Sequence, residues 1–184
     1  MKNLNEKEVR RISKFMSLVL RHKPETIGLQ LDSEGWAEVD ELIEKMRRAG
    51  RRIDRPTLDW VVDHNNKKRF AFSADGTRIR ASQGHSIKID LGYAPVAPPE
   101  FLYHGTVDRF IPAIRESGIQ KMRRHAVHLS QDQKTAINVG NRRGKALILV
   151  VRAGEMHRAG FSFFVSENGV WLTDKVPAEY IDFA

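Results

Sequence analysis

Residues 87–99, with the sequence IKIDLGYAPVAPP, divide this chain into two parts. The stretch holds one glycine and three prolines and shows neither a helical nor a strand period, so we interpret it as a linker region. Residues 1–90 then form a first lobe, residues 91–99 the linker and residues 100–184 a second lobe. A chain of 184 residues has room for two small domains.

The first lobe is predicted to begin with three helices. Apolar residues at helical spacing indicate a helix that starts after a cap at Asn5 and cannot continue through Pro24. A second helix is expected to stop at Gly50, and a third to start near Asp54 with Pro56 in its first turn.

A β-hairpin is expected to follow these helices. Phe70 and Phe72 alternate, Asp75-Gly76 is typical of a tight turn, and Ile79 lies on the returning strand. Helices followed by a two-stranded wing predict a winged-helix-like lobe. Such lobes commonly dock on nucleic acid, although a fold alone does not decide a function.

The second lobe alternates short strands with short helices and is predicted to be α+β. The expected strands span residues 101–104, 127–130, 146–151, 163–165 and 170–172, and the expected helices span 107–117 and 132–139. Neither G-x-G-x-x-G nor a Walker A loop occurs, which disfavours a Rossmann dinucleotide site and a P-loop.

The composition is basic and free of cysteine. The 31 Lys and Arg against 23 Asp and Glu give a net charge of +8, which favours a polyanionic partner but is equally compatible with an inert basic surface. The lack of cysteine excludes disulfides, Cys-ligated zinc and thiol catalysis, and it suits a cytoplasmic protein. Neither a membrane span nor a signal peptide is expected.

Two groups of cationic residues in the first lobe could hold an anion. Arg21-His22-Lys23-Pro24 ends the first helix, where basic residues also act simply as C-caps that complement the helix dipole. Arg69 opens the wing and should point away from the core, although a solvated charge run is the more common explanation for such a basic triplet.

Two segments of the second lobe could hold a polar ligand. His104-Gly105-Thr106 lies between a strand and a helix, where Gly105 would allow close approach of a ligand and Thr106 could cap the helix; a simple turn is the alternative. If the strand at 127–130 is regular, Arg124, His128 and Ser130 share one face.

No metal is predicted. A regular strand would place His125 and His128 on opposite faces, so the two histidines would not share an ion. The remaining histidines show no spacing that is typical of metal ligands.

Seven short motifs occur together in the order and spacing of one family. They are RHKP at 21–24, GW at 35–36, KRF at 68–70, QGHS at 83–86, YHGT at 103–106, VHLS at 127–130 and ENGVWLT at 167–173. Through them the chain resembles the RNA 2′-phosphotransferases, in particular their bacterial KptA branch. The resemblance implies a winged-helix RNA lobe followed by an NAD lobe of the ADP-ribosyltransferase fold.

The resemblance also implies a two-step reaction with NAD as consumed co-substrate. The internal 2′-phosphate of a tRNA-like RNA attacks C1″ of NAD and expels nicotinamide, which leaves an ADP-ribosylated 2′-phosphate. The ribose 2″-hydroxyl then attacks that phosphorus, which releases the RNA and ADP-ribose 1″,2″-cyclic phosphate. The enzyme is expected to act as a monomer on these two partners.

The roles of single residues follow from the same resemblance. The family's catalytic tetrad falls on Arg21, His22, Arg69 and Arg124. The three guanidiniums are expected to bind the phosphate, and the imidazole to transfer a proton or donate a hydrogen bond. The residues expected to bind NAD are His104, Gly105, Thr106, His128 and Ser130, with Gly140 and Arg142 as weaker candidates.

Three neighbouring positions qualify this assignment. Arg123 adjoins Arg124, and the spacing to His128 favours the latter. Protein-modifying ADP-ribosyltransferases often place a catalytic glutamate where this chain is expected to have Val170, and Glu167 is not its equivalent.

Two other classes of function stay open: an ADP-ribosyltransferase that caps terminal phosphates of nucleic acids or modifies protein, and a non-catalytic RNA-binding module.

Overall fold

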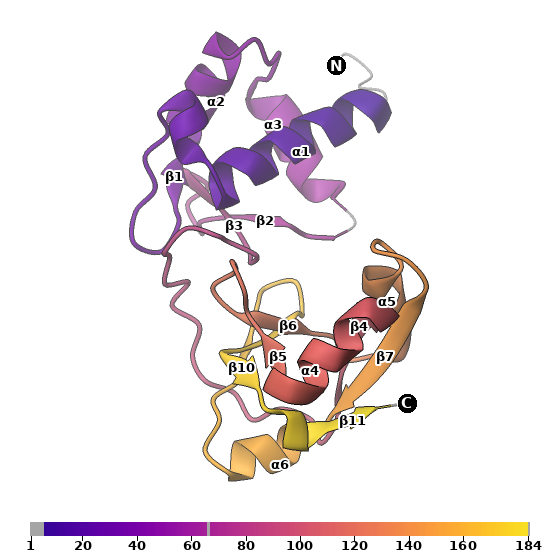
Figure 1. Ribbon diagram of the computed structural model, residues 1–184. Helices are drawn as coiled ribbons and strands as arrows, with labels where there is room; N and C mark the ends of the chain where they lie inside the picture. The colour runs from indigo at the N-terminus through magenta and orange to yellow at the C-terminus, as the bar shows by residue number, and fades with distance from the viewer. Residues whose placement is uncertain (1–5, 66, 184) are drawn as a thin grey trace. The chain divides into compact units, whose positions relative to one another are not determined.

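Among the described residues, three α-helices, a 3₁₀ turn and a small sheet lie within Met1–Gly92, the first of two compact units in the computed structural model (Figure 1). The structure describes residues 6–65 and 67–183, so the predicted cap at Asn5 lies outside the described residues. The elements are α1 (Glu6–Arg21), a 3₁₀ turn (Pro24–Ile27), β1 (Ala37–Glu38), α2 (Val39–Arg48), α3 (Arg55–Asp63), β2 (Phe70–Phe72) and β3 (Arg78–Ala81).

The hairpin predicted for this unit is confirmed. β2 and β3 are antiparallel, with Phe70 opposite Ala81 and Phe72 opposite Ile79. A third strand, β1, pairs with the other edge of β3 and places Ala37 opposite Ile79. The strand β1 was not predicted, because two residues are too few to show a period.

The helices of the first unit enclose its apolar core. α3 starts where it was predicted, since the Asp54 side chain accepts a hydrogen bond of 2.9 Å from the Thr57 amide. α1 and α3 pack against each other, and α1 also packs on β3. The fully buried side chains include Met16, Leu42 and Leu58, one from each helix.

In the second unit, Tyr93–Ala184, antiparallel pairing joins the described strands into three small sheets. Its helices are α4 (Ile111–Ser117), α5 (Gln133–Gly140) and α6 (Ala153–Arg158). Its strands are β4 (Leu102–Val107), β5 (Ile119–Gln120), β6 (Val127–Leu129), β7 (Ala146–Val151), β8 (Phe164–Val165), β9 (Trp171–Thr173), β10 (Lys175–Val176) and β11 (Ile181–Phe183). The sheets have the orders β11-β7-β4, β6-β9-β8 and β10-β5. The mixed helix and strand composition that was predicted is therefore confirmed.

Residues 87–99, which span the boundary between the two units, have no regular secondary structure, and their role as a linker stays a prediction. Within the part of the chain that the structure describes, no helix combines the length and apolar character needed to cross a lipid bilayer.

The close crossing of α5 over β4 requires glycine at two positions. A Cβ atom on Gly105 would lie 1.9 Å from the carbonyl oxygen of Ala136 in α5. Gly140 faces back toward β4, and a Cβ atom there would lie 3.1 Å from the carbonyl oxygen of Thr106. The two glycines therefore let the backbones of the helix and the strand touch.

The expected end of β4 is wrong. The strand continues through Thr106 to Val107, and a 3₁₀ turn at Asp108–Phe110 precedes α4. Thr106 is buried inside the strand, and it caps neither that turn nor α4. The reason is pairing with β7, since the six residues of β4 face six residues of β7 and extend the strand beyond the motif.

Candidate active site

Arg21 and Arg69 of the first unit are joined where the end of α1 meets the start of β2. The Arg21 Nη2 atom donates a hydrogen bond of 3.2 Å to the Arg69 carbonyl oxygen. The Arg21 guanidinium also lies 6.0 Å from the centre of the Phe70 ring, so the apolar face of the hairpin supports it. The sequence separates these residues by nearly fifty positions, and the hairpin brings them together.

The Arg69 side chain is held by a buried amide. Its Nη1 atom donates a hydrogen bond of 3.0 Å to Oδ1 of Asn65. Asn65 is buried, and its Nδ2 atom donates to Oγ of Ser13 in α1 at 3.1 Å. Asn65 thus positions Arg69 relative to α1, a role that sequence analysis missed. An asparagine that follows a helix gave no signal for it.

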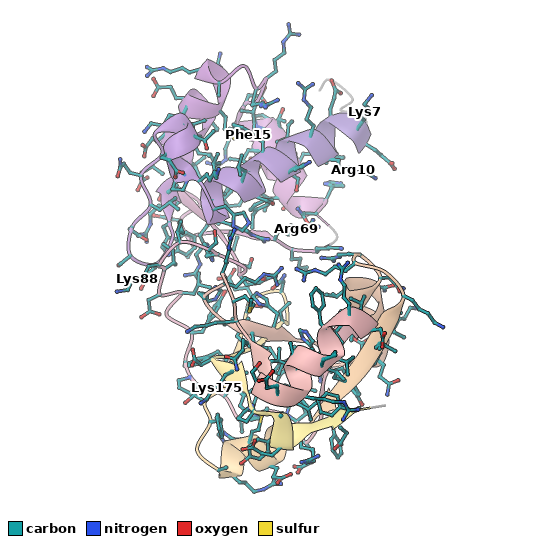
Figure 2. All side chains as sticks on the ribbon, in the orientation of Figure 1. Lys7, Arg10, Phe15, Arg69, Lys88 and Lys175 are labelled. Carbon is teal, nitrogen blue, oxygen red and sulfur yellow. The ribbon has the colours of Figure 1, made fainter. Side chains whose placement is uncertain are left out.

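His22 lies at the exposed end of α1 and contacts Ser86. The Nδ1 atom of His22 and Oγ of Ser86 are 2.9 Å apart. The Ser86 backbone is fixed in turn, because its amide donates to the Arg21 carbonyl oxygen at 3.0 Å. Ser86 had been noted only as part of the QGHS motif, and its contact identifies it as a positioning residue for the imidazole. Figure 2 labels Arg69 among the side chains of this unit.

In the second unit, β4 and β6 bring two histidines together. Tyr103 and Ser130 form an antiparallel bridge with both backbone hydrogen bonds at 2.8 Å. Beside it, Nδ1 of His104 lies 3.1 Å from the His128 carbonyl oxygen. Because a carbonyl oxygen only accepts, Nδ1 of His104 carries a proton, and in the neutral ring Nε2 is then an acceptor.

His104 is kept neutral by its surroundings. Burial lowers the pKa of its imidazole, the hydrogen bond to the His128 carbonyl oxygen raises it, and the positive charges of Arg124 and Arg143 lower it again. The net direction is below the ordinary value of 6.5. His104 can therefore accept a hydrogen bond from a ligand hydroxyl group at neutral pH.

Arg124 belongs to a group of mutually repelling arginines. Desolvation lowers the pKa of its guanidinium, and the charges of Arg143 and Arg142 lower it further. The Arg143 guanidinium also lies 5.7 Å from the centre of the Phe110 ring. Like charges placed this close to one another are stabilised by a bound anion. No role was predicted for Arg143, and its basic neighbour Arg142 was the only signal in the sequence.

The predicted row of Arg124, His128 and Ser130 on one strand is wrong in part. His128 and Ser130 are partly exposed and flank the buried Leu129, as strand alternation requires. β6 starts only at Val127, so Arg124 lies in the preceding turn, where its amide donates to the Lys121 carbonyl oxygen.

The same short strand corrects the prediction for the histidine pair. The rings of His125 and His128 lie 6.0 Å apart at 83°, so the two residues are not on opposite faces. His125 precedes the strand, and its ring lies beside that of His128. Among the described residues, no group of three His, Cys, Asp or Glu side chains could hold a metal ion.

The close approach at Gly105 and Gly140 is made by α5 and β4. Both glycines are used for packing, which leaves their cofactor-binding roles as predictions. Val170 is partly buried, and its amide donates to Oγ of Ser166 at 3.1 Å, while Glu167 is exposed in the turn before it.

Comparison with known proteins identifies the class of enzyme. Residues 6–175 match the family model described as "RNA 2'-phosphotransferase, Tpt1 / KptA family". Since this match spans most of the chain, the protein belongs to the Tpt1/KptA family of RNA 2′-phosphotransferases and is a transferase.

Full-length bacterial relatives carry the same description. A protein of Flavobacterium johnsoniae named "Probable RNA 2'-phosphotransferase" is 57% identical over 98% of this chain and 99% of its own length. Proteins of the same name from Pseudomonas aeruginosa and Escherichia coli are 55% and 50% identical. The first covers 92% of this chain and 93% of its own length, and the second covers both chains completely.

Proposed function

We propose that this protein uses NAD to remove an internal 2′-phosphate from RNA in two steps. The phosphate oxygen attacks C1″ of the nicotinamide ribose, and nicotinamide leaves. The 2″-hydroxyl of that ribose then attacks phosphorus, and the RNA 2′-oxygen leaves with a proton. The products are a 2′-hydroxyl on the RNA and ADP-ribose 1″,2″-cyclic phosphate. A cytoplasmic setting, which the cysteine-free sequence suits, is part of the proposal.

The first unit, proposed to be a winged-helix-like RNA lobe, supplies groups for the phosphate. The contact between Arg21 and the backbone of Arg69 is the observation that carries the proposal, because it brings the Arg21 guanidinium to a second arginine residue that lies far along the sequence. Planar guanidinium groups can donate two parallel hydrogen bonds to a phosphate. Arg69 is additionally held by Asn65, so the geometry of its donors is fixed before the ligand arrives.

His22 is proposed to move the proton of the second step. The departing 2′-oxygen needs a proton, and an exposed imidazole is suited to supply it near neutral pH. Ser86 contacts Nδ1 and so selects which ring nitrogen faces the RNA. The first nucleophile is already anionic at neutral pH, so that step depends on orientation rather than on a base.

The second unit, proposed to have an ADP-ribosyltransferase-like fold, suits a dinucleotide. The neutral His104, whose Nδ1 is used by the His128 backbone, leaves an acceptor for a ribose hydroxyl. His128 and Ser130 are partly exposed on the neighbouring strand. Arg124, Arg142 and Arg143 concentrate positive charge for a pyrophosphate. NAD itself supplies an electrophilic C1″ with a good leaving group.

The test is a product analysis with one defined substrate. Purified protein is incubated with NAD and a short RNA that bears one internal 2′-phosphate, and both products are identified by mass spectrometry. We expect dephosphorylated RNA, nicotinamide and ADP-ribose 1″,2″-cyclic phosphate in equal amounts. Stable ADP-ribosylated RNA without cyclic phosphate would instead indicate an ADP-ribosyltransferase that caps phosphates. RNA binding without any product would indicate a non-catalytic module.

A further inference from the structure

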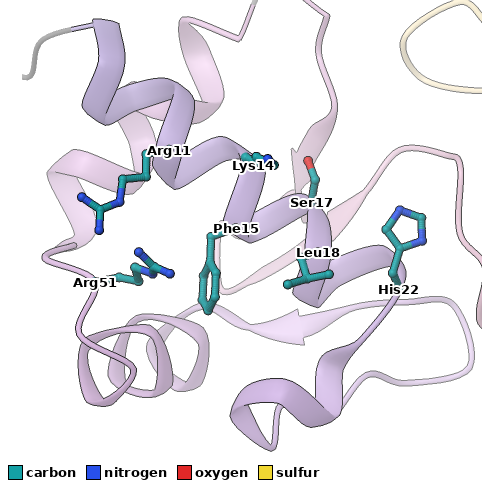
Figure 3. Close-up of a pocket in the computed structure, with 7 residues that line it drawn as sticks. All are labelled: Arg11, Lys14, Phe15, Ser17, Leu18, His22 and Arg51. Carbon is teal, nitrogen blue, oxygen red and sulfur yellow. The ribbon is translucent and has the colours of Figure 1, made fainter. Parts of the chain in front are cut away.

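A hollow on α1 is lined at one end by His22, a residue of the proposed site. Its volume is about 620 Å³, which is in the range of sites that bind small molecules. One face of α1 forms most of the lining, and one residue comes from the loop after α2 (Figure 3). The lining residues are Arg11, Lys14, Phe15, Ser17, Leu18, His22 and Arg51.

The lining combines an apolar surface with cationic groups. Phe15 and Leu18 supply the apolar part, and Phe15 is only partly buried although it packs on the core. The Arg51 guanidinium lies 4.4 Å from the centre of the Phe15 ring, which Figure 3 shows beside it. Arg11 and Lys14 are exposed. Among the described residues that line the hollow, none is acidic.

The hollow extends from Arg11 to His22 along the helix. The ten helical steps of 1.5 Å from Arg11 to Arg21, where α1 ends, already give a length of about 15 Å, more than one nucleotide needs. At one end the lining includes the His22 imidazole, which the proposed function places at the reacting phosphate. A ligand held at His22 would continue along α1, across the apolar surface and past the cations.

We propose that this hollow binds single-stranded RNA next to the 2′-phosphate. One base stacks on the Arg51 guanidinium, which Phe15 supports from its other side, and backbone phosphates contact Arg11 and Lys14. A nucleotide matches this lining because it joins a flat, weakly polar ring to an anion, and proteins that bind single strands combine aromatic surfaces with cationic grooves in this way. This inference rests on the proposed function, since that function places the RNA at His22.

The experiment measures RNA binding without NAD for two ligands. One is a dinucleotide that bears a 2′-phosphate, and the other is a single strand of about eight nucleotides that bears the same group. Arg51→Ala and Arg11→Ala test the hollow. Arg52→Ala and Arg10→Ala are matched controls, because each removes one positive charge from the adjacent exposed residue, which does not line the hollow.

The two ligands should respond differently. We expect Arg51→Ala to weaken binding of the longer strand by roughly tenfold, the size of one lost stacking contact. Arg51→Lys keeps the charge but loses the planar surface, so it should also weaken that strand. Binding of the dinucleotide should change by less than about twofold in every variant, as should binding of the longer strand by both controls.

Two results would overturn the proposal. One is equal weakening by the hollow variants and their controls, which would indicate diffuse charge attraction alone. The other is unchanged binding of the longer strand by Arg51→Ala and Arg11→Ala. Thermal melting of each variant identifies a loss of RNA binding that comes from unfolding. If Arg51→Ala unfolds, binding of the longer strand by Arg51→Lys decides whether the hollow binds RNA. Failure of the proposed function is recognised separately, because wild-type protein would then give no cyclic phosphate from the dinucleotide.

Discussion

Replacing Gly105 with alanine should destabilise the second unit through the contact between β4 and α5. The added Cβ atom would lie 1.9 Å from the Ala136 carbonyl oxygen, whereas ordinary contacts of this kind begin at 3.4 Å. Relief needs a movement of about 1.5 Å by backbone atoms, which cannot rotate aside as a side chain can. Overpacking typically costs 1–3 kcal/mol, and we expect the upper end, about 3 kcal/mol.

Thermal unfolding measures this cost. For a cooperative unit of this size, about 3 kcal/mol corresponds to a fall in Tm of roughly 12–24 °C. Gly160→Ala is the control in the same unit, because nothing lies within 4 Å of its added Cβ and only its positive φ of 95° is strained. Its cost should be about 1–2 kcal/mol. A Gly105→Ala variant that melts within 2 °C of wild type but binds NAD weakly would refute the packing role and favour a glycine kept for the ligand.

Three further outcomes are expected. Arg69→Ala should slow the second step by roughly two to three decades, because it removes a charge-stabilising donor, and rapid-quench analysis should show ADP-ribosylated RNA accumulating. Hydrogen bonds from Ser73 and Thr77 lower the pKa of Asp75 from its ordinary value of 3.8 to about 2. The ionised carboxylate therefore stabilises the folded state fully above pH 3.8, and this stability is lost as the pH falls toward 2. Asp75→Asn should show a smaller fall in Tm than wild type between these pH values. NAD binding should weaken through protonation of His104 only below pH 6.5. Calorimetry should show no such weakening of the NAD affinity in His104→Asn.

The helices and the hairpin could be predicted because their signals are local. Asp54 caps α3 with its own side chain, and the alternation of Phe70 and Phe72 reports directly which face is buried. The end of β4 could not be predicted from its own residues. Thr106 has the side chain of a helix cap, and only pairing with β7, forty residues later, keeps it in a strand.

The candidate site divides in the same way. The residue types that bear charge, such as Arg21 and His22, could be found from their clustering at a helix end. Asn65 and Ser86 could not, because each acts through one hydrogen bond to a residue far along the chain. Gly105 was found for a different reason from the one that the structure gives, since a glycine in a motif indicates close approach without indicating what approaches.

The charge of the two clusters bears on which nucleophile the enzyme can use. Arg21 donates to a backbone carbonyl oxygen and Arg69 donates to the Asn65 side-chain amide, both of which are neutral acceptors. Desolvation lowers the pKa of Arg124, and repulsion from Arg143 and Arg142 lowers it further. Holding such groups together costs free energy that an incoming anion returns, so a ligand with several negative charges is bound better than a neutral one. A phosphate nucleophile and a pyrophosphate-bearing co-substrate both meet that requirement. A neutral protein side chain as acceptor would leave the repulsion in place, which is why the clusters favour transfer to an RNA phosphate over modification of protein.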